Sequence, residues 1–126
     1  MIFGIGTDIV ETKRIADAMA RHGEHFTGYI LTERERKEAE RHSDQIQFTA
    51  SRWAAKEAVA KALGCGFGSQ CALHDIEILH SPSGAPVVSL SGKGLETMRS
   101  LGISRILISI SHEHSAAVAF AVAEKM

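Results

Sequence analysis

The spacing of hydrophobic positions divides the first third of the chain into a strand and two helices. Residues 2–10 are mostly β-branched or aromatic with two glycines, which predicts a strand that ends in a turn. Apolar positions three and four apart then predict a helix over residues 12–22. Thr32 and Glu35 form a capping box that begins a second helix over residues 33–42, in which acids and bases interleave. This charge-dense helix is predicted to be solvated.

The longest helical pattern covers residues 47–63, where an apolar stripe among good helix formers ends at Gly64. Beyond it hydrophobic residues recur at every second position, which is the period of a strand and not of a helix. Residues 74–79 and 85–90 alternate on either side of a Ser-Pro-Ser-Gly turn, which predicts a hairpin.

The last quarter of the chain repeats this change of period. Apolar residues three positions apart over residues 95–101 predict a short helix. Two runs of alternating apolar residues, at residues 104–111 and 116–123, predict a final pair of strands. Helices and strands in this order indicate an α+β fold with a largely antiparallel sheet. No linker or repeat interrupts the pattern, so residues 1–126 are predicted to form one small domain.

Composition and charge exclude several classes of function. The 14 basic and 15 acidic residues give a net charge of -1, whereas nucleic-acid binding draws on an excess of Lys and Arg. No apolar run approaches the roughly 20 residues that span a bilayer. We therefore expect a cytoplasmic protein that binds neither nucleic acid nor membrane. A domain of 126 residues has little spare interior, so a large ligand is expected in a surface cleft or between subunits.

The glycine pair at Gly4 and Gly6 suggests a dinucleotide-binding loop, but Ile9 occupies the place of the third glycine and no βαβ unit follows. That class of site is excluded. The feature that remains is Asp8, a carboxylate just beyond a flexible glycine pair at the end of a strand. Either Asp8 contacts a ligand or it caps the following helix.

Two charged pairs lie on the long helix. Glu57 and Lys61 are four residues apart and share a face, as do Arg52 and Lys56. Surface salt bridges are the simplest interpretation. The alternative is a site, because a carboxylate one turn from a lysine suits a divalent cation next to a phosphate. Asp8 with Glu57 would suffice for Mg²⁺, which usually takes only one or two protein carboxylates.

Three further residues are candidates for binding. His112 begins the turn between the last two strands, where a histidine either donates to a phosphate or is simply exposed. Arg14 and Arg21 are seven residues apart and therefore aligned on the first helix. They form either a solvated face or a docking strip for an acidic partner.

Three segments together resemble a known family: GIGTDIVETKRI, SRWAAKEAVAKALG and SISHEHSAAVAFAV. In this order and at these separations they resemble holo-acyl-carrier-protein synthase, the small bacterial 4′-phosphopantetheinyl transferase, over essentially the whole chain. The resemblance implies that family's fold and its reaction. In that reaction the phosphopantetheine arm of coenzyme A is transferred to a serine of apo acyl carrier protein, which releases adenosine 3′,5′-bisphosphate.

The resemblance also implies roles for the candidate residues. Asp8 and Glu57 would hold Mg²⁺ against the coenzyme A diphosphate, and Lys61 would neutralise phosphate oxygens. Arg52 and His112 would lie near the adenosine 3′-phosphate. The preferred base for the serine proton is Glu57, acting through a water held by the metal. Asp8 is the alternative base, so Glu57, Asp8 and Lys61 are the expected catalytic set.

Assembly and docking follow from the same resemblance. Arg14 and Arg21 would dock the acidic carrier, and the protein would be a homotrimer with active sites between adjacent subunits. The chain departs from the family pattern at Trp53, Cys65 and Glu113. Two other functions stay open: a different Mg²⁺-dependent enzyme acting on a nucleotide or phosphoester, and a non-catalytic module that binds an acidic partner.

Overall fold

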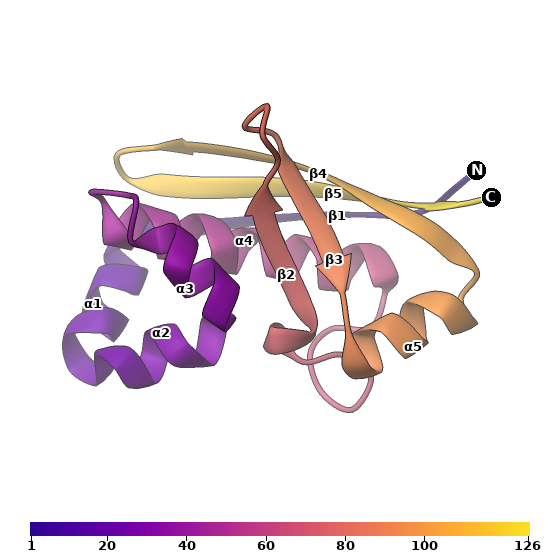
Figure 1. The fold of residues 1–126 in the computed structure, drawn as a ribbon, viewed down its shortest axis with the longest axis horizontal. Helices are drawn as coiled ribbons and strands as arrows, with labels where there is room; N and C mark the ends of the chain where they lie inside the picture. Colours follow the sequence, from indigo (N-terminus) through magenta and orange to yellow (C-terminus); the bar gives the residue numbers. More distant parts are fainter.

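The computed structural model describes residues 1–126 as a pair of antiparallel sheets packed with helices (Figure 1). Strands β1 (Ile2–Glu11), β5 (Ala116–Lys125) and β4 (Ile103–Glu113) form a three-stranded sheet in that spatial order. Strands β2 (Ile76–His80) and β3 (Pro86–Leu90) form a separate hairpin. The predicted α+β class and the antiparallel pairing are confirmed, although the strands belong to two sheets.

The helices occupy the predicted regions, with one addition. None of them is both long and apolar enough to span a bilayer. Their bounds are α1 (Thr12–His22), α2 (Glu24–Ile30), α3 (Glu33–Ala39), α4 (Gln45–Leu63) and α5 (Gly92–Ser100), and a single 3₁₀ turn covers Leu73–Asp75.

The added helix is α2, which the sequence pattern does not reveal. Its sequence EHFTGYI contains threonine, tyrosine and glycine, all weak helix formers. Gly23 reverses the chain before it with a φ of 53°. Ile30 at its end is fully buried against Phe48, and Phe26 packs at the edge of the same cluster. Tertiary packing therefore determines this helix more than local propensity does.

The core lies between α4 and the inner face of the three-stranded sheet. Small side chains meet there: Ala58 of α4 and Ala119 and Ala121 of β5 are buried. A Cβ at Gly6 would lie 2.0 Å from the carbonyl oxygen of Ala58. The backbones of β1 and α4 are therefore in direct contact, and this close approach brings the next inward-facing residue of β1, Asp8, to the surface of the helix.

The outer face of the three-stranded sheet is apolar and uncovered. Alternation along the strands places Ile5, Ile9, Leu107 and Phe120 on this face, and each is 45–69% exposed. Figure 1 shows the helices gathered on the opposite side of the sheet. An exposed apolar surface of this kind is typical of a protein–protein contact.

The prediction that residues 33–42 form a solvated helix holds only in part, because α3 ends at Ala39 and one of its charged residues is buried while Glu33, Arg34, Arg36 and Lys37 are exposed. The capping box of Thr32 and Glu35 is present, but the Glu35 side chain is completely buried. Its Oε1 atom lies 2.7 Å from Nζ of Lys56, and its Oε2 atom accepts a hydrogen bond from the backbone N–H of Ile78. Glu35 thus joins α3 to α4 and β2, because a buried carboxylate requires such partners.

Candidate active site

Three of the predicted site residues converge where β1 crosses α4. The Lys61 ammonium donates to Oδ1 of Asp8 at 3.1 Å and to the backbone oxygen of Thr7 at 2.9 Å. Asp8 does not cap the following helix, since Glu11 occupies the N-cap position of α1. The carboxylate is therefore free to serve a ligand, with Lys61 beside it.

Glu57 lies one turn before Lys61 on α4 and faces the same site. Its pKa is raised, first by partial burial and second by the negative charge of Asp8, while Lys61 acts in the opposite direction. The two carboxylates are thus close enough to repel each other. A divalent cation placed with them would relieve that repulsion.

The donor set fits Mg²⁺ bound jointly with a substrate. No group of three or more His, Cys, Asp or Glu side chains gathers into a closed metal site. Two carboxylates are nevertheless enough for Mg²⁺, which takes its remaining ligands from water and substrate phosphates. Asp8 and Glu57 are therefore suited to a metal that arrives with a phosphate ester, and Lys61 supplies a further positive charge.

Arg52 and His112 meet at a second location, a pocket of about 220 Å³ beside the first turns of α4. The two residues come from α4 and from the end of β4. The pocket has few apolar residues in its wall. Its lining comprises His42, Gln47, Phe48, Ser51, Arg52, His80, Gly84, Pro86, Ile110 and His112.

Arg52 is only 2% exposed, and its partners come from α3, from β2 and from its own helix. One Nη atom donates to Oε2 of Glu38 at 3.2 Å, and the guanidinium lies 4.4 Å above the ring centre of Phe48. Its Nε–H is buried without an acceptor. A buried donor without a partner is costly, so Arg52 is prepared to bind an anion that enters the pocket.

The predicted surface pairing of Arg52 with Lys56 is wrong. Both side chains are buried, and each pairs with a glutamate of α3, Arg52 with Glu38 and Lys56 with Glu35. Burial lowers the pKa of Arg52, and the two glutamates raise it. Charges in the interior need such partners, and here the partners come from a different helix.

His112 is exposed at the rim of the pocket, where its Nδ1 lies 2.7 Å from Nε2 of Gln47. The neighbouring Glu113 accepts a hydrogen bond from Ser115 and does not line the pocket. Successive residues of a strand point to opposite faces, which explains why the acid next to His112 does not enter its site.

Arg14 and Arg21 are both exposed on α1, and neither forms an ion pair. Ile15 is the buried residue of this helix. The arginines are therefore available to an acidic partner.

Sequence reasoning missed three polar residues around the arginine pocket: Glu38, His42 and His80. Glu38 lies in a run of alternating charges, His42 lies in the connection between α3 and α4, and His80 is the last residue of β2. No local pattern distinguishes them, because their proximity depends on how α3, α4 and the β2–β3 hairpin pack. The one available signal was the number of histidines, seven in 126 residues.

Paired carboxylates with a lysine, and a separate arginine pocket on the same helix, suit a ligand that carries more than one phosphate. The fold and the site thus define a small α+β transferase of phosphate esters. The chain belongs to the 4′-phosphopantetheinyl transferase superfamily, whose model matches residues 4–121.

Individual relatives agree with this assignment. The chain is 46% identical to holo-[acyl-carrier-protein] synthase of Hydrogenovibrio crunogenus over 98% of both chains. Its fold is similar to that of the crystal structure of holo-[acyl-carrier-protein] synthase from Neisseria meningitidis, with a TM-score of 0.94, 40% identity, and coverage of 99% of this chain and 100% of the other. The Helicobacter pylori enzyme in complex with coenzyme A matches with a TM-score of 0.85 and 34% identity, over 95% of this chain and 99% of the other.

Proposed function

We propose that this protein transfers the 4′-phosphopantetheine group from coenzyme A to a serine of apo acyl carrier protein in a Mg²⁺-dependent reaction. The observation that carries this conclusion is the convergence of Asp8, Glu57 and Lys61 in a member of the 4′-phosphopantetheinyl transferase superfamily. The similarity to a relative crystallised with coenzyme A supports the donor substrate.

The reaction exchanges one ester of a phosphate for another. The serine oxygen forms a bond to the phosphorus that bears the pantetheine arm, and the bond from that phosphorus to the bridging diphosphate oxygen breaks. Adenosine 3′,5′-bisphosphate leaves with the bridging oxygen, and the serine proton passes to a base. Such transfers depend mainly on positioning and on neutralisation of charge.

Asp8 and Glu57 would hold Mg²⁺, whose positive charge would offset that of the diphosphate. Lys61, fixed by Asp8 and by the backbone of Thr7, places an ammonium beside the same oxygens. Glu57 is the better candidate for the base. It would act through a water held by the metal, because a water held by a cation is easier to deprotonate. Asp8 is the alternative base.

The arginine pocket would receive the adenosine 3′-phosphate. Arg52 supplies a buried cation with an unpaired Nε–H, and His112 supplies a rim donor. Guanidinium groups bind phosphates through their fixed array of donors. Arg52 and His112 would therefore retain the nucleotide end of coenzyme A while the other end reacts.

Several features support a homotrimer with sites shared between subunits. Arg52 and Glu57 are five residues apart on α4, so at about 100° per residue they project about 140° apart around the helix. One chain therefore directs its two sites to different sides. The apolar outer face of the three-stranded sheet would be covered in such an assembly, and one subunit would supply Asp8 and Glu57 while its neighbour supplies Arg52.

Carrier docking would use α1. Arg14 and Arg21 are exposed and unpaired, and an acidic carrier would be attracted to them over a distance set by ionic strength. In this proposal the reaction takes place in the cytoplasm.

The deciding experiment incubates the protein with coenzyme A, Mg²⁺ and apo acyl carrier protein and then measures the carrier mass. We expect a mass increase of one phosphopantetheine arm, which chelation of the metal abolishes. A carrier of unchanged mass would reject the proposal. Nucleotide turnover without carrier would favour the other phosphoester enzyme, and carrier binding without any Mg²⁺-dependent reaction would favour the non-catalytic module.

A further inference from the structure

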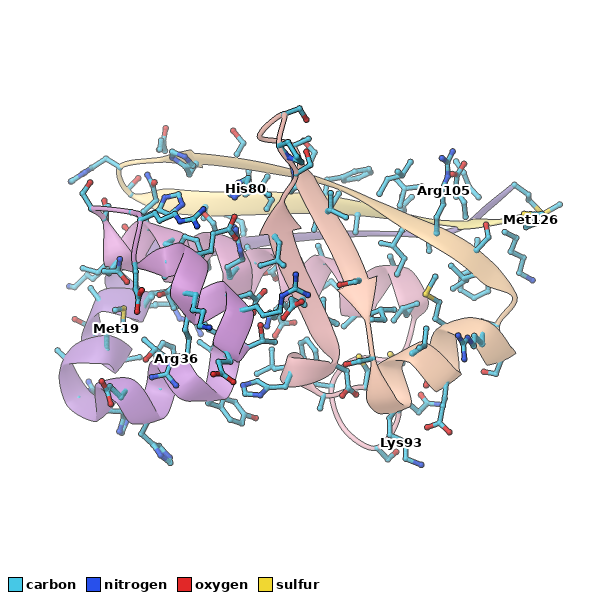
Figure 2. All side chains as sticks on the ribbon, viewed as in Figure 1. Met19, Arg36, His80, Lys93, Arg105 and Met126 are labelled. Carbon is cyan, nitrogen blue, oxygen red and sulfur yellow. The ribbon has the colours of Figure 1, made fainter.

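His80 lies in the arginine pocket and is held by a carboxylate that also holds Arg52. Its ring Nδ1 is 2.9 Å from Oε1 of Glu38, and its backbone N–H donates to the same oxygen at 3.0 Å. The other oxygen of Glu38 accepts from Arg52. Figure 2 labels His80 at the end of β2 that approaches the three-stranded sheet. Glu38 therefore holds two basic side chains, Arg52 and His80, in the wall of one pocket.

The hydrogen bonds determine which ring nitrogen of His80 carries a proton. Nδ1 has two neighbours, Oε1 of Glu38 at 2.9 Å, which only accepts, and an Nη atom of Arg52 at 3.4 Å, which only donates. The shorter contact decides the tautomer, so Nδ1 donates to Glu38 and Arg52 acts on the ring as a nearby charge. In the neutral ring Nε2 is then an acceptor, which a phosphate oxygen would repel. Protonation turns Nε2 into a donor and adds a positive charge. His80 can bind a phosphate only in that form.

His112 on the opposite wall has the reverse arrangement. The Gln47 amide nitrogen can only donate, so Nδ1 of His112 accepts from it. The Nε2 of His112 then carries a proton in the neutral ring. His112 can donate to a phosphate without changing its charge, whereas His80 cannot.

The charges around His80 are mostly positive, and Glu38 is its neighbouring acid. Glu38, Arg34 and Lys37 of α3 and Arg41 just beyond its end line an adjoining hollow of about 370 Å³ with His80. Within this group Arg34 is paired with Glu77 of β2. Arg52 approaches from α4, with an Nη atom 3.4 Å from Nδ1 of His80. The remaining titratable neighbours are His42, whose ring centre is 6.2 Å away, and His112 across the pocket. A bound phosphate dianion would offset this excess of positive charge.

We propose that His80 is a further phosphate ligand, which takes up a proton from solvent when the phosphate binds and then donates to it from Nε2, with Glu38 as its positioning residue. The identity of the phosphate, the 3′-phosphate of coenzyme A or of the bisphosphate product, rests on the proposed function. His80 would in this way favour nucleotides that carry a 3′-phosphate over those that lack one.

Calorimetric titration with adenosine 3′,5′-bisphosphate tests this directly, since the product needs no carrier and no turnover. Titration in buffers of different ionisation enthalpy measures the protons taken up on binding. For the wild-type protein at about pH 8 we expect uptake of a large fraction of one proton, because Nε2 can donate to the phosphate only from the protonated ring. His80→Gln should remove most of that uptake and weaken binding at about pH 6 by roughly 10- to 100-fold, the usual strength of a charge-assisted hydrogen bond.

Four comparisons isolate His80. Glu38→Gln keeps an acceptor for Nδ1 but removes the charge, so it should reduce proton uptake in a folded protein. His112→Gln should weaken binding at both pH values and leave the uptake in place. His42→Gln should also leave it in place, because the His42 ring packs at a tilt of 47° against Phe48 and makes no hydrogen bond to a carboxylate. His25→Gln, on the exposed surface of α2, should change nothing.

The nucleotide provides a further control. Phosphate monoesters themselves titrate near pH 6, and the wild-type protein and His80→Gln share this contribution, so their difference reports His80. Adenosine 5′-monophosphate, which lacks the 3′-phosphate, should bind with the same proton uptake in both proteins. If His80→Gln bound the bisphosphate with the same proton uptake as the wild-type protein, the inference would be overturned and the proposed function would stay intact. No bisphosphate binding to the wild-type protein would overturn both.

Discussion

Nζ of Lys56 lies 2.7 Å from Oε1 of Glu35, and neither side chain is exposed to solvent. The same ammonium donates to the backbone oxygens of Ile30 and Leu73. Burial lowers the pKa of Lys56, and Glu35 opposes that change. This one side chain therefore connects α4 to α2, α3 and the 3₁₀ turn, and it immediately precedes Glu57 of the candidate site.

Removal of the Lys56 charge should destabilise the fold strongly. Lys56→Met leaves the Glu35 carboxylate buried without its counter-ion, and broken buried pairs cost about 3–5 kcal/mol. Chemical denaturation measures the free energy of unfolding. Lys37→Met removes an exposed lysine from α3 and should change stability by less than about 0.5 kcal/mol. Equal stabilities of the two variants would show that the buried pair does not support the fold.

A second prediction concerns the contact between β1 and α4. A Cβ at Gly6 would lie 2.0 Å from the backbone oxygen of Ala58. Backbone atoms of a helix cannot move aside as the end of a flexible side chain can. We expect Gly6→Ala to lower the free energy of unfolding by about 3 kcal/mol and to move Asp8 away from Lys61, with a loss of activity.

Gly28→Ala is the matched control for Gly6→Ala. A Cβ at Gly28 would meet only the end of the Arg36 side chain at 3.6 Å, and alanine favours a helix by about 0.5–1 kcal/mol. This variant should gain stability. A Gly6→Ala protein as stable and active as Gly28→Ala would contradict the requirement for close approach.

These contacts explain what could be predicted from the sequence. The long helix ends at Gly64 as predicted, because good helix formers precede a glycine with a φ of 79°. The i,i+4 spacing of Glu57 and Lys61 correctly placed them on one face. That Asp8 joins them depends on Gly4 and Gly6, whose role is visible only once α4 lies against the strand.

The errors share a different cause. Glu35 and Lys56 are 21 residues apart, and within each local segment they look like ordinary surface charges. Only the packing of α3 against α4 shows that the two charges neutralise each other in the interior. The same holds for Glu38 and His80, 42 residues apart. Charge patterning identifies a helix surface, but it does not reveal a buried partner from another element.

Glu57→Gln should abolish transfer without loss of the fold. The substitution keeps the shape of the side chain and removes both a metal ligand and a base, so we expect kcat to fall by about 10²–10⁴-fold. The mass of the carrier over time measures this rate. Glu96→Gln, an exposed glutamate of α5, should retain full activity. An active Glu57→Gln enzyme would remove Glu57 from the site.

The same variant should have a pH-dependent stability. The pKa of Glu57 is raised in the folded protein, so its ionised form opposes folding at neutral pH. Glu57→Gln should therefore be more stable than the wild-type protein at neutral pH. The difference should narrow as pH falls through the raised pKa and vanish below the ordinary glutamate range. Denaturation curves over this pH range test the sign, and a constant difference would contradict it.

Arg14→Glu should weaken carrier recognition alone. Reversal of an exposed charge on α1 should raise the KM for acyl carrier protein by about tenfold, roughly 1.4 kcal/mol, and leave the KM for coenzyme A nearly unchanged. Added salt should shrink the effect. Lys93→Glu makes the same reversal on α5, which Figure 1 shows on the opposite side of the β2–β3 hairpin from α1, and should leave both KM values nearly unchanged. Equal increases in both KM values would show that α1 is not the docking surface.

Phe120→Asp should separate the subunits. Phe120 is 45% exposed in the centre of the apolar sheet face, where a carboxylate would be buried without a partner on assembly. Light scattering after size exclusion should give a trimer for the wild-type protein and a monomer for this variant. Because each site would draw residues from two subunits, transfer should be lost with the trimer. Tyr29→Asp changes a more exposed aromatic residue, 66% exposed on α2, and should remain an active trimer. A trimeric Phe120→Asp protein would show that the subunits meet elsewhere.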